Sequence, residues 1–384
     1  MKKDPLLIIG ASARAAAFSA YRAGFDPCWI DEFGDQDLAA AFPGAAVAPA
    51  DYPAGIIEKL KAIPVMPWFY TGAVENHTHL FGDISRTHPL LGNNRDVCQS
   101  VRDPEKLGKC LKSAGIVFPE TLHSAADITT DKAYLLKPAR SGGGLGISIY
   151  TGGDTVPPGY VLQERVEGDS RSAVFIGNGE RAVLAGVTRQ LVGVKEFNAA
   201  TFAYCGSIGP LTLDRKVREQ WNQIGTALVK EFGLLGLFGV DAVCDNGKII
   251  PVEVNPRYTA SVEVIELAMG VPLIEYHVRA CRGQLPERMP MPEKLCGKAV
   301  LFAPCDFEIG RDLYASKDNI AGDSTRLADI PPRGAGIKNG HPLLTLLAGG
   351  GTQEECLRTL VNGAGTIFDL LLSPHNADRA AHYM

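Results

Sequence analysis

The segment from Phe238 to Asn255 constrains the fold of this chain more than any other part of the sequence. Two apolar runs flank an Asp-Asn-Gly turn at residues 245–247, so the segment is predicted to form an antiparallel hairpin. With a three-residue loop, Asp241 would lie opposite Pro251. A register slip of one residue would move Asp241 to the other face of the sheet.

Three side chains with oxygen ligands are predicted to share one face of this hairpin. Side chains alternate along a strand, so Glu253 and Asn255 point to one face, and in the expected register Asp241 joins them. One Asp, one Glu and one Asn, completed by phosphate oxygens, suit octahedral Mg²⁺, with Mn²⁺ as the alternative ion. An ordinary hairpin with a polar, solvated face is the competing interpretation.

A glycine-rich loop follows another predicted strand. The predicted strand ends at Lys137, and the loop that follows, up to Gly146, contains four glycines within six positions. Glycines allow backbone N–H groups to approach phosphate oxygens closely, and the lysine adds a compact positive charge. The run indicates a phosphate-binding loop, with a flexible hairpin as the alternative.

A third apolar strand, residues 161–168, runs into charged residues. Adenine commonly occupies an apolar slot edged by backbone groups and one carboxylate. Taken by itself, this segment is better explained as a strand end that carries a solvated acid.

The chain opens with a βαβ pattern. Residues 6–10 form a short apolar run that ends in glycine, an alanine-rich helix follows, and residues 27–31 are a second strand candidate. Such units build parallel sheets, so a Rossmann-like domain is expected. The turn after Gly10 lacks the G-x-G-x-x-G pattern despite Asp31 near the ribose-binding position. The N-terminus of the following helix could still hold an anionic substrate group.

The remaining chain alternates between helices and short strands. Asp103 before Pro104 predicts an N-capped helix. Further helices are expected near residues 217–233, 261–270 and 353–362, and a proline-rich linker at 286–292. The fold class is therefore α/β and α+β. The expected domains are a Rossmann-like unit (1–92), a nucleotide-binding and catalytic region (93–290) and a C-terminal α/β segment that completes the fold (291–384).

Composition argues against several classes of protein. The formal net charge is −5 and the pI about 5.9, without the basic clusters that nucleic-acid binding requires. No apolar run approaches the roughly 20 residues of a membrane helix, and Asp4 and Pro5 interrupt any secretion signal. The nine cysteines are scattered without a C-x-x-C spacing, which is typical of free thiols in a reducing compartment. A cytoplasmic location is expected.

In chain order, these signals resemble the ATP-grasp superfamily. The lysine and glycine loop come first, the strand at 163–166 follows, and Asp241 precedes the Glu-Val-Asn-Pro-Arg run at 253–257. The resemblance covers roughly residues 94–285. It implies that ATP lies between two α+β subdomains. The flanks, Tyr-Thr-Gly-Ala-Val-Glu-Asn at 70–76 and residues 329–342, are similar to the carboxylate–amine ligase branch.

The resemblance also implies a role for each matching residue. The catalytic residues would be Arg257, which would steady the transferring phosphoryl group or the substrate carboxylate, and Lys137. The metal ligands would be Asp241, Glu253 and Asn255. The residues implied in nucleotide binding are Lys106, Lys137, Ser141, Gly142, Gly143, Gly144, Gly146, Gln163, Glu164, Arg165, Val166, Glu167 and Asp169.

Two of these positions depart from the usual family pattern. Many members carry a phosphate-binding lysine directly after an Asp, whereas here Pro104 and Glu105 separate Asp103 from Lys106. The ribose-binding acid is ambiguous between Glu167 and Asp169.

The function implied is an ATP-dependent ligase that activates a carboxylate as an acyl phosphate and couples it to an amine. Small-molecule substrates are expected, and a homodimer is left open. A small-molecule kinase and a non-catalytic nucleotide-binding protein are the alternatives. His77, His79 and His88 could line the acceptor pocket, bind a transition metal or face solvent.

Overall fold

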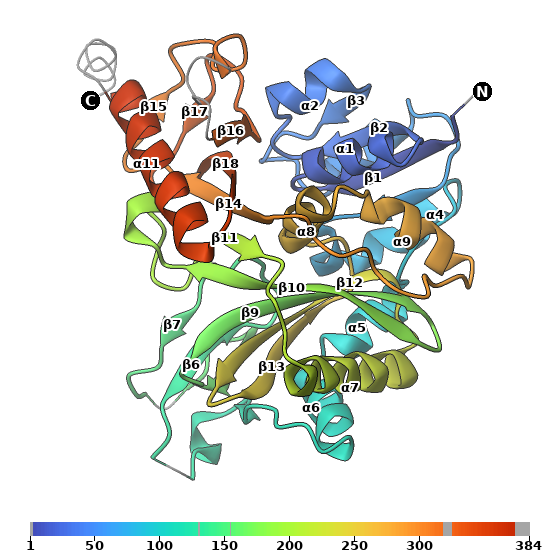
Figure 1. Ribbon diagram of the computed structural model, residues 1–384, viewed down its shortest axis with the longest axis vertical. Coiled ribbons are helices and arrows are strands. Elements are labelled where there is room, and N and C mark those ends of the chain that lie inside the picture. The colour runs from blue at the N-terminus through green and yellow to red at the C-terminus, as the bar shows by residue number, and fades with distance from the viewer. Residues whose placement is uncertain (1–2, 130, 154, 318–324, 373–384) are drawn as a thin grey trace.

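A computed structural model describes residues 3–129, 131–153, 155–317 and 325–372 of the chain. Figure 1 shows the N-terminal unit and the last part of the chain side by side in the upper half, with the middle part of the chain, coloured green to yellow, below them. Parallel and antiparallel sheets are both present, as the expected fold class requires. No described helix is long and apolar enough to span a membrane.

The N-terminal unit is a four-stranded parallel sheet with strand order β3-β2-β1-β4. The run at 6–9 is continuously apolar because both faces of β1 are covered. Leu6 and Ile8 pack with the alanines of α1, whereas Leu7 and Ile9 pack with Ile56 and Phe81 on the other face. The elements are β1 (Pro5–Gly10), α1 (Arg14–Arg22), β2 (Asp26–Asp31), α2 (Gln36–Ala41), β3 (Gly44–Ala46), α3 (Gly55–Leu60), β4 (Trp68–Tyr70) and α4 (Phe81–Ser85).

The large sheet has eight antiparallel strands in the order β13-β12-β9-β10-β11-β14-β18-β16. It therefore joins the predicted nucleotide-binding region to the C-terminal segment without a break. The strands are β9 (Asp169–Asn178), β10 (Ala182–Val192), β11 (Tyr204–Gly209), β12 (Leu235–Asp245), β13 (Lys248–Asn255), β14 (Leu295–Phe302), β16 (Thr325–Ala328) and β18 (Pro342–Gly350).

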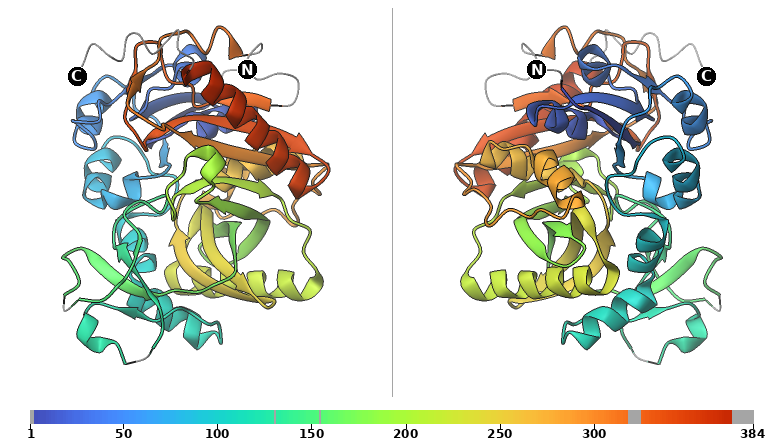
Figure 2. Two further views of the ribbon diagram at one scale, coloured as in Figure 1. Left: turned by 90° about the vertical axis from the view of Figure 1, so that its left-hand side faces the viewer. Right: turned by 90° about the vertical axis from the view of Figure 1, so that its right-hand side faces the viewer.

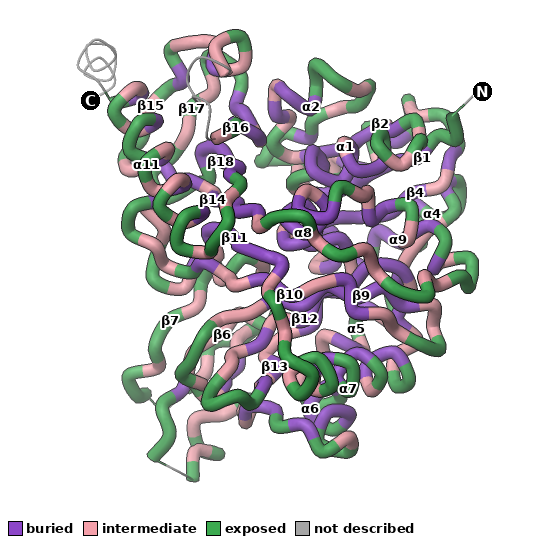
Figure 3. The backbone as a smooth tube through the Cα atoms, viewed as in Figure 1, coloured by how far each residue is buried: buried purple, intermediate pink, exposed green. Residues whose placement is uncertain are grey.

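Helices cover both faces of this sheet, and Figure 3 shows buried residues along its central strands. On β9, Ala173 and Phe175 pack against α7, whereas Val174 and Ile176 pack towards α8 and α9. Around β14 and β18, α11 buries a separate apolar cluster. The helices are α7 (Arg215–Phe232), α8 (Ala260–Met269), α9 (Leu273–Cys281) and α11 (Gln353–Leu372).

The small sheet has the order β5-β8-β6-β7 and lies to one side of α7 in Figure 2. Asp103 caps the helix before it, because Asp103 Oδ1 accepts from the N–H groups of Glu105 and Lys106 at 3.0 and 3.2 Å. This N-cap prediction is confirmed. The elements are α5 (Arg95–Val101), α6 (Pro104–Ser113), β5 (Thr121–Leu122), β6 (Tyr134–Pro138), β7 (Ser148–Ile149) and β8 (Tyr160–Glu164).

The remaining predicted elements agree closely with the structure. Helices α7 and α8 lie within two residues of the expected ranges at both ends, and no helix or strand interrupts the expected linker at 286–292. The last helix begins at Gln353 as predicted but continues for 20 residues. Its apolar positions past residue 362, including Ala364 and Ile367, extend the core against β14 and β18.

Candidate active site

A cleft of about 400 Å³ lies where the small sheet, the large sheet and the N-terminal unit meet. Its volume is in the range of small-molecule sites. The sequence-predicted residues that line it are Lys137, Gly143, Gly144, Gln163, Glu164, Val166, Asp241, Glu253, Asn255 and Arg257. The fold thus brings together the lysine, the glycine loop and the acidic hairpin.

The register of the metal hairpin differs from the prediction. The turn has two residues, Asn246 and Gly247, both with positive φ, and Asp245 pairs with Lys248. Continued unchanged, this register would put Asp241 opposite Val252 and on the wrong face. A β-bulge adds one residue to β13, so Asp241 instead pairs with Glu253. The expected pairing with Pro251 was wrong, yet the bulge returns Asp241 to the predicted face.

The hairpin gathers the predicted metal ligands around the half-buried carboxylate of Asp241. Asn255 Nδ2 donates to Asp241 Oδ2 at 3.0 Å, and Gln190 Nε2 donates to Oδ1 at 3.0 Å. Burial and the neighbouring Glu253 raise the pKa of Asp241 to about 6. A bound cation would relieve this cost, so the donor set fits Mg²⁺. Gln190 was missed, and no motif around it offered a signal.

The glycine loop lies against the segment that leads into β11. The Tyr204 N–H donates to the Gly143 carbonyl oxygen at 2.9 Å. Gly144 has φ +76°, and a Cβ there would lie 1.9 Å from the Phe202 carbonyl oxygen, so only glycine fits. Beside the loop, Lys137 Nζ donates to Gln163 Oε1 at 2.9 Å. A phosphate group could compete for this ammonium.

The predicted adenine segment borders an apolar part of the cleft. Glu164 Oε2 accepts from Lys132 Nζ at 3.0 Å. The Arg165 N–H donates to the Ala133 carbonyl oxygen at 2.8 Å. This N–H is therefore already hydrogen-bonded within the protein, next to the small sheet. The apolar side chains that line this part are Leu135, Ile147, Val166, Val243 and Val252.

Other predicted nucleotide-binding residues lie away from the cleft. Ser141 lines a neighbouring cavity, and Lys106 is exposed on α6. Asp169 forms an ion pair with Arg171 at 2.9 Å and lines a cavity on the opposite face of the large sheet. The remaining residues that do not line the cleft are Gly142, Gly146, Arg165 and Glu167. Their roles stay predictions.

Arg257 is held by the segment at 70–76. Its Nε donates to Glu75 Oε1 at 2.6 Å, and its Nη2 donates to Asn255 Oδ1 at 3.1 Å. Arg102 secures the same segment through the Glu75 carbonyl oxygen at 2.9 Å and Asn76 Oδ1 at 2.8 Å. Glu75 was missed as a site residue, although the motif that contains it was noted.

Beyond Arg257 the cleft continues into a region that we call the acceptor lobe. It lies between the N-terminal ends of α1 and α8. Its lining residues are Ala11, Ser12, Ala15, Thr71, Gly72, Arg257, Tyr258, Thr259, Ala260, Ser261 and Lys298. Lys298 was also missed, although a lysine inside the apolar strand at 295–302 is a signal of a buried charge.

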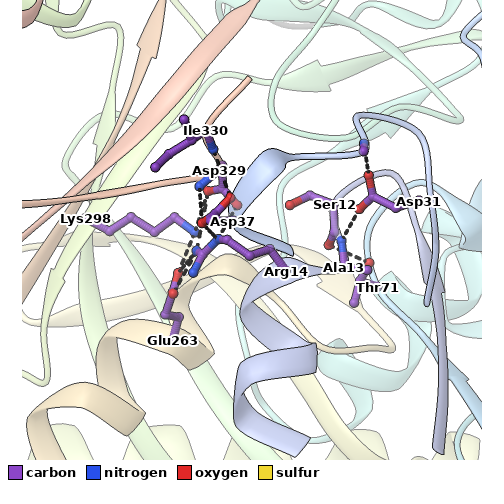
Figure 4. A network of polar contacts seen from close by, with 11 residues as sticks. Ser12, Ala13, Arg14, Asp31, Asp37, Thr71, Glu263, Lys298, Asp329 and Ile330 are labelled. Atoms are coloured by element: carbon purple, nitrogen blue, oxygen red, sulfur yellow. Dashed lines mark hydrogen bonds and ion pairs between the residues drawn. The ribbon is translucent and has the colours of Figure 1, made fainter. Parts of the chain in front are cut away.

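A carboxylate of the protein binds the backbone at the N-terminal end of α1. Asp31 accepts from the Ala13 N–H at 2.6 Å and from the Gly34 N–H at 2.7 Å (Figure 4). Burial raises the pKa of Asp31 to about 7. Asp31 therefore satisfies the N–H of the N-cap residue Ala13, and the expectation that this helix end holds a substrate anion stays a prediction. At α8, in contrast, the N-cap residue Thr259 forms no side-chain capping bond.

The histidines do not line the cleft. The His77 and His79 rings lie 6.1 Å apart, whereas His88 is buried with its Nδ1 2.8 Å from Thr87 Oγ1. Within the described part of the chain, no group of three or more His, Cys, Asp or Glu side chains is arranged to hold a metal ion.

Comparison with known proteins gives the same family signal. Residues 101–261 match the ATP-grasp domain family. The chain is 26% identical over 289 residues to an uncharacterized protein of Methanocaldococcus jannaschii, covering 71% of this chain and 66% of that protein. It is 23% identical over 231 residues to the carbamoyl phosphate synthase arginine-specific large chain of Bacillus subtilis, covering 56% of this chain and 22% of that protein. The chain thus spans less than two thirds of either relative.

A solved structure extends the likeness to nearly the whole chain. The L-amino acid ligase from Bacillus licheniformis superposes with a TM-score of 0.70 at 15% identity, covering 95% of this chain and 98% of that one. At this identity the likeness concerns the fold alone.

Proposed function

This chain contains an ATP-grasp domain, and from that premise we propose that it is an ATP-dependent ligase that activates a carboxylate and joins it to an amine. The observation that carries the proposal is the continuity of one cleft. Lys137 and the acidic hairpin line its nucleotide half, Arg257 lies where the two halves meet, and the cleft continues into the acceptor lobe.

In the proposed reaction, a substrate carboxylate attacks the γ-phosphorus of ATP, and ADP leaves. The resulting acyl phosphate is attacked by an amine, which releases phosphate and forms an amide. Asp241, Glu253 and Asn255 would hold Mg²⁺, which supplies neutralisation of phosphate charge when bound. Lys137 would bind a phosphate oxygen and give up its bond to Gln163.

Arg257 would orient the carboxylate for attack. Glu75 and Asn255 fix its guanidinium through the contacts at 2.6 and 3.1 Å, which supports a preorganised role. Its Nη1 donates to the Tyr258 carbonyl oxygen at 3.1 Å, so three contacts restrain the group. Positioning and charge neutralisation would then provide most of the rate enhancement, without a side-chain nucleophile.

The glycine loop would exclude water from the acyl phosphate. Its contacts with residues 202–204 hold it across the cleft. Hydrolysis of the intermediate would waste ATP, so this closure favours ligation.

The test is a panel of carboxylic acids with amines, assayed for ADP release and for amide by mass spectrometry. We expect at least one pair to stimulate ADP release in the wild type, and Glu253→Gln to lower that release roughly 100- to 1,000-fold because a metal ligand loses its charge. A stable phosphorylated small molecule as end product would favour a kinase instead. Binding of ATP without any turnover would favour the non-catalytic alternative. The cytoplasmic location and a homodimer stay predictions.

A further inference from the structure

Lys298 brings a buried positive charge to the acceptor lobe. It projects from β14, and its side chain is only 7% exposed while still lining the cleft. Its Nζ donates to Glu263 Oε2 at 2.8 Å and lies 3.8 Å from Asp329 Oδ2 (Figure 4). An ammonium has three N–H donors, and a single strong contact leaves donor capacity for a ligand.

Arg14 shares both of these carboxylates. Its Nη2 donates to the two Glu263 oxygens at 2.8 and 2.9 Å, and its Nε donates to Asp329 Oδ1 at 2.5 Å. Burial opposes ionisation of Glu263 and Asp329, but Arg14 and Lys298 outweigh it and hold the pKa of both carboxyls below the usual range. Arg14 and Lys298 thus share Glu263 and Asp329, with Asp37 as a third carboxylate 3.7 Å from Arg14 Nε, and these ion pairs fix Lys298 in place.

The surroundings of Lys298 also favour an anion. Ser207, which pairs with Lys298 across the sheet, lies 3.2 Å from Ser261 through their hydroxyl oxygens. Ser261 lines the lobe in the first turn of α8, where free N–H groups favour negative charge. Thr259 Oγ1, at the cap of this helix, is buried and has no hydrogen-bond partner.

Arg257 and Lys298 are anchored differently within the lobe. Arg257 is tied to Asn255 at the metal hairpin, next to the site of phosphoryl transfer. Lys298 is tied to Glu263, one turn along α8 from Thr259. The lobe therefore offers one cation beside the reaction centre and a second cation on a separate support.

We propose that Lys298 binds an acidic group of the substrate other than the carboxyl that is activated, with Arg14, Glu263 and Asp329 as positioning residues. The substrate class is then a small molecule with a second anionic group, a carboxylate or a phosphate. This inference rests on the proposed function, because it assumes that the activated carboxyl lies at Arg257.

The experiment is ligand-observed NMR binding to the MgADP-saturated full chain. Glutarate carries two carboxylates, pentanoate carries one on a chain of equal length, and phosphonoacetate adds a phosphonate arm. We expect the wild type to bind glutarate or phosphonoacetate roughly 10- to 100-fold more tightly than pentanoate, since a charge-assisted contact is at stake. The tighter of the two distinguishes a carboxylate from a phosphate.

Variants assign that preference to Lys298. Lys298→Met should abolish it with little change for pentanoate, and Lys298→Arg should retain part of it. Lys298→Gln, which keeps a donor towards Glu263, serves if the Met variant does not fold. The matched control is Lys338→Met, which removes an exposed lysine paired with Asp306 at 2.7 Å. It should bind every probe as the wild type does.

Equal binding of one and two acidic groups by the wild type would overturn the inference, as would Lys298→Met weakening all probes alike. Binding of none of the acids, with MgADP bound, also overturns it. Failure of the wild type to bind MgATP or MgADP would instead reject the proposed function.

Discussion

The two halves of the cleft balance their charges in opposite ways. In the nucleotide half, Asp241 and Glu253 face each other across adjacent strands, and burial and Glu253 raise the pKa of Asp241 to about 6 although Arg257 acts against them. In the acceptor lobe, Arg14 and Lys298 already form ion pairs with Glu263 and Asp329. The carboxylates of the nucleotide half still need a bound cation. Those of the acceptor lobe already have cationic partners before any ligand binds.

The largest effect on stability should come from removing the ion pairs that Arg14 forms in the acceptor lobe. Arg14→Met would leave Glu263 and Asp329 buried with Lys298 as the sole strong cation. Removing one partner of a buried ion pair typically costs about 3–5 kcal/mol, so chemical denaturation should show a comparable loss of unfolding free energy. The exposed pair Lys61–Glu58 supplies the control, since Lys61→Met should cost less than about 1 kcal/mol. Equal losses in the two variants would contradict the comparison.

A smaller effect is expected from displacing the glycine loop in the nucleotide half. In Gly144→Ala the new Cβ would lie 1.9 Å from the Phe202 carbonyl oxygen at φ +76°, so the loop must move. We expect the KM for ATP to rise by roughly tenfold, the equivalent of about 1.4 kcal/mol. The Cβ of Gly142→Ala meets no atom within 4 Å, so this variant should perturb the KM less. A larger rise in KM for Gly142→Ala than for Gly144→Ala would show that the contact of Gly144 with Phe202 does not position the loop for ATP binding.

The smallest effect is the pH dependence of magnesium binding in the nucleotide half, which tests whether its carboxylates differ from those of the acceptor lobe. Mg²⁺ requires ionised Asp241, whose pKa of about 6 lies above the ordinary value of 3.8. Magnesium affinity should therefore fall about fivefold between pH 6 and pH 5, as measured by calorimetry. Without metal the sign is opposite, because the folded state holds the extra proton: Asp241 destabilises the fold as pH rises from about 4 to 6. Asp241→Asn should remove both trends.

Much of the nucleotide half could be predicted because its parts are local in sequence. The hairpin turn, the glycine loop and the face shared by Glu253 and Asn255 follow from strand alternation and turn chemistry. The bulge at residue 252 could not be foreseen, because the point where the extra residue enters the ladder with β12 is set by tertiary pairing. Propensity alone does not encode that constraint.

The acceptor lobe was largely invisible in the sequence. Arg14 and Asp329 are 315 positions apart, and Arg14 and Glu263 are 249 apart, so no motif spans them. The helix at 14–22 was predicted, but its partners depend on tertiary packing. Asp31 was noticed for its spacing from Gly10, yet it accepts from backbone N–H groups that only the folded turn brings together.

The continuity of the large sheet has a consequence for how this architecture can vary. A chain shortened after residue 290 would lose β14, β18 and β16, and with them the hydrogen-bonding partner of β11. The bare edge would invite association with other strands, and the pocket would lose Lys298. The strands β14, β16 and β18 therefore cannot be exchanged as a detachable module without opening the sheet that lines the cleft.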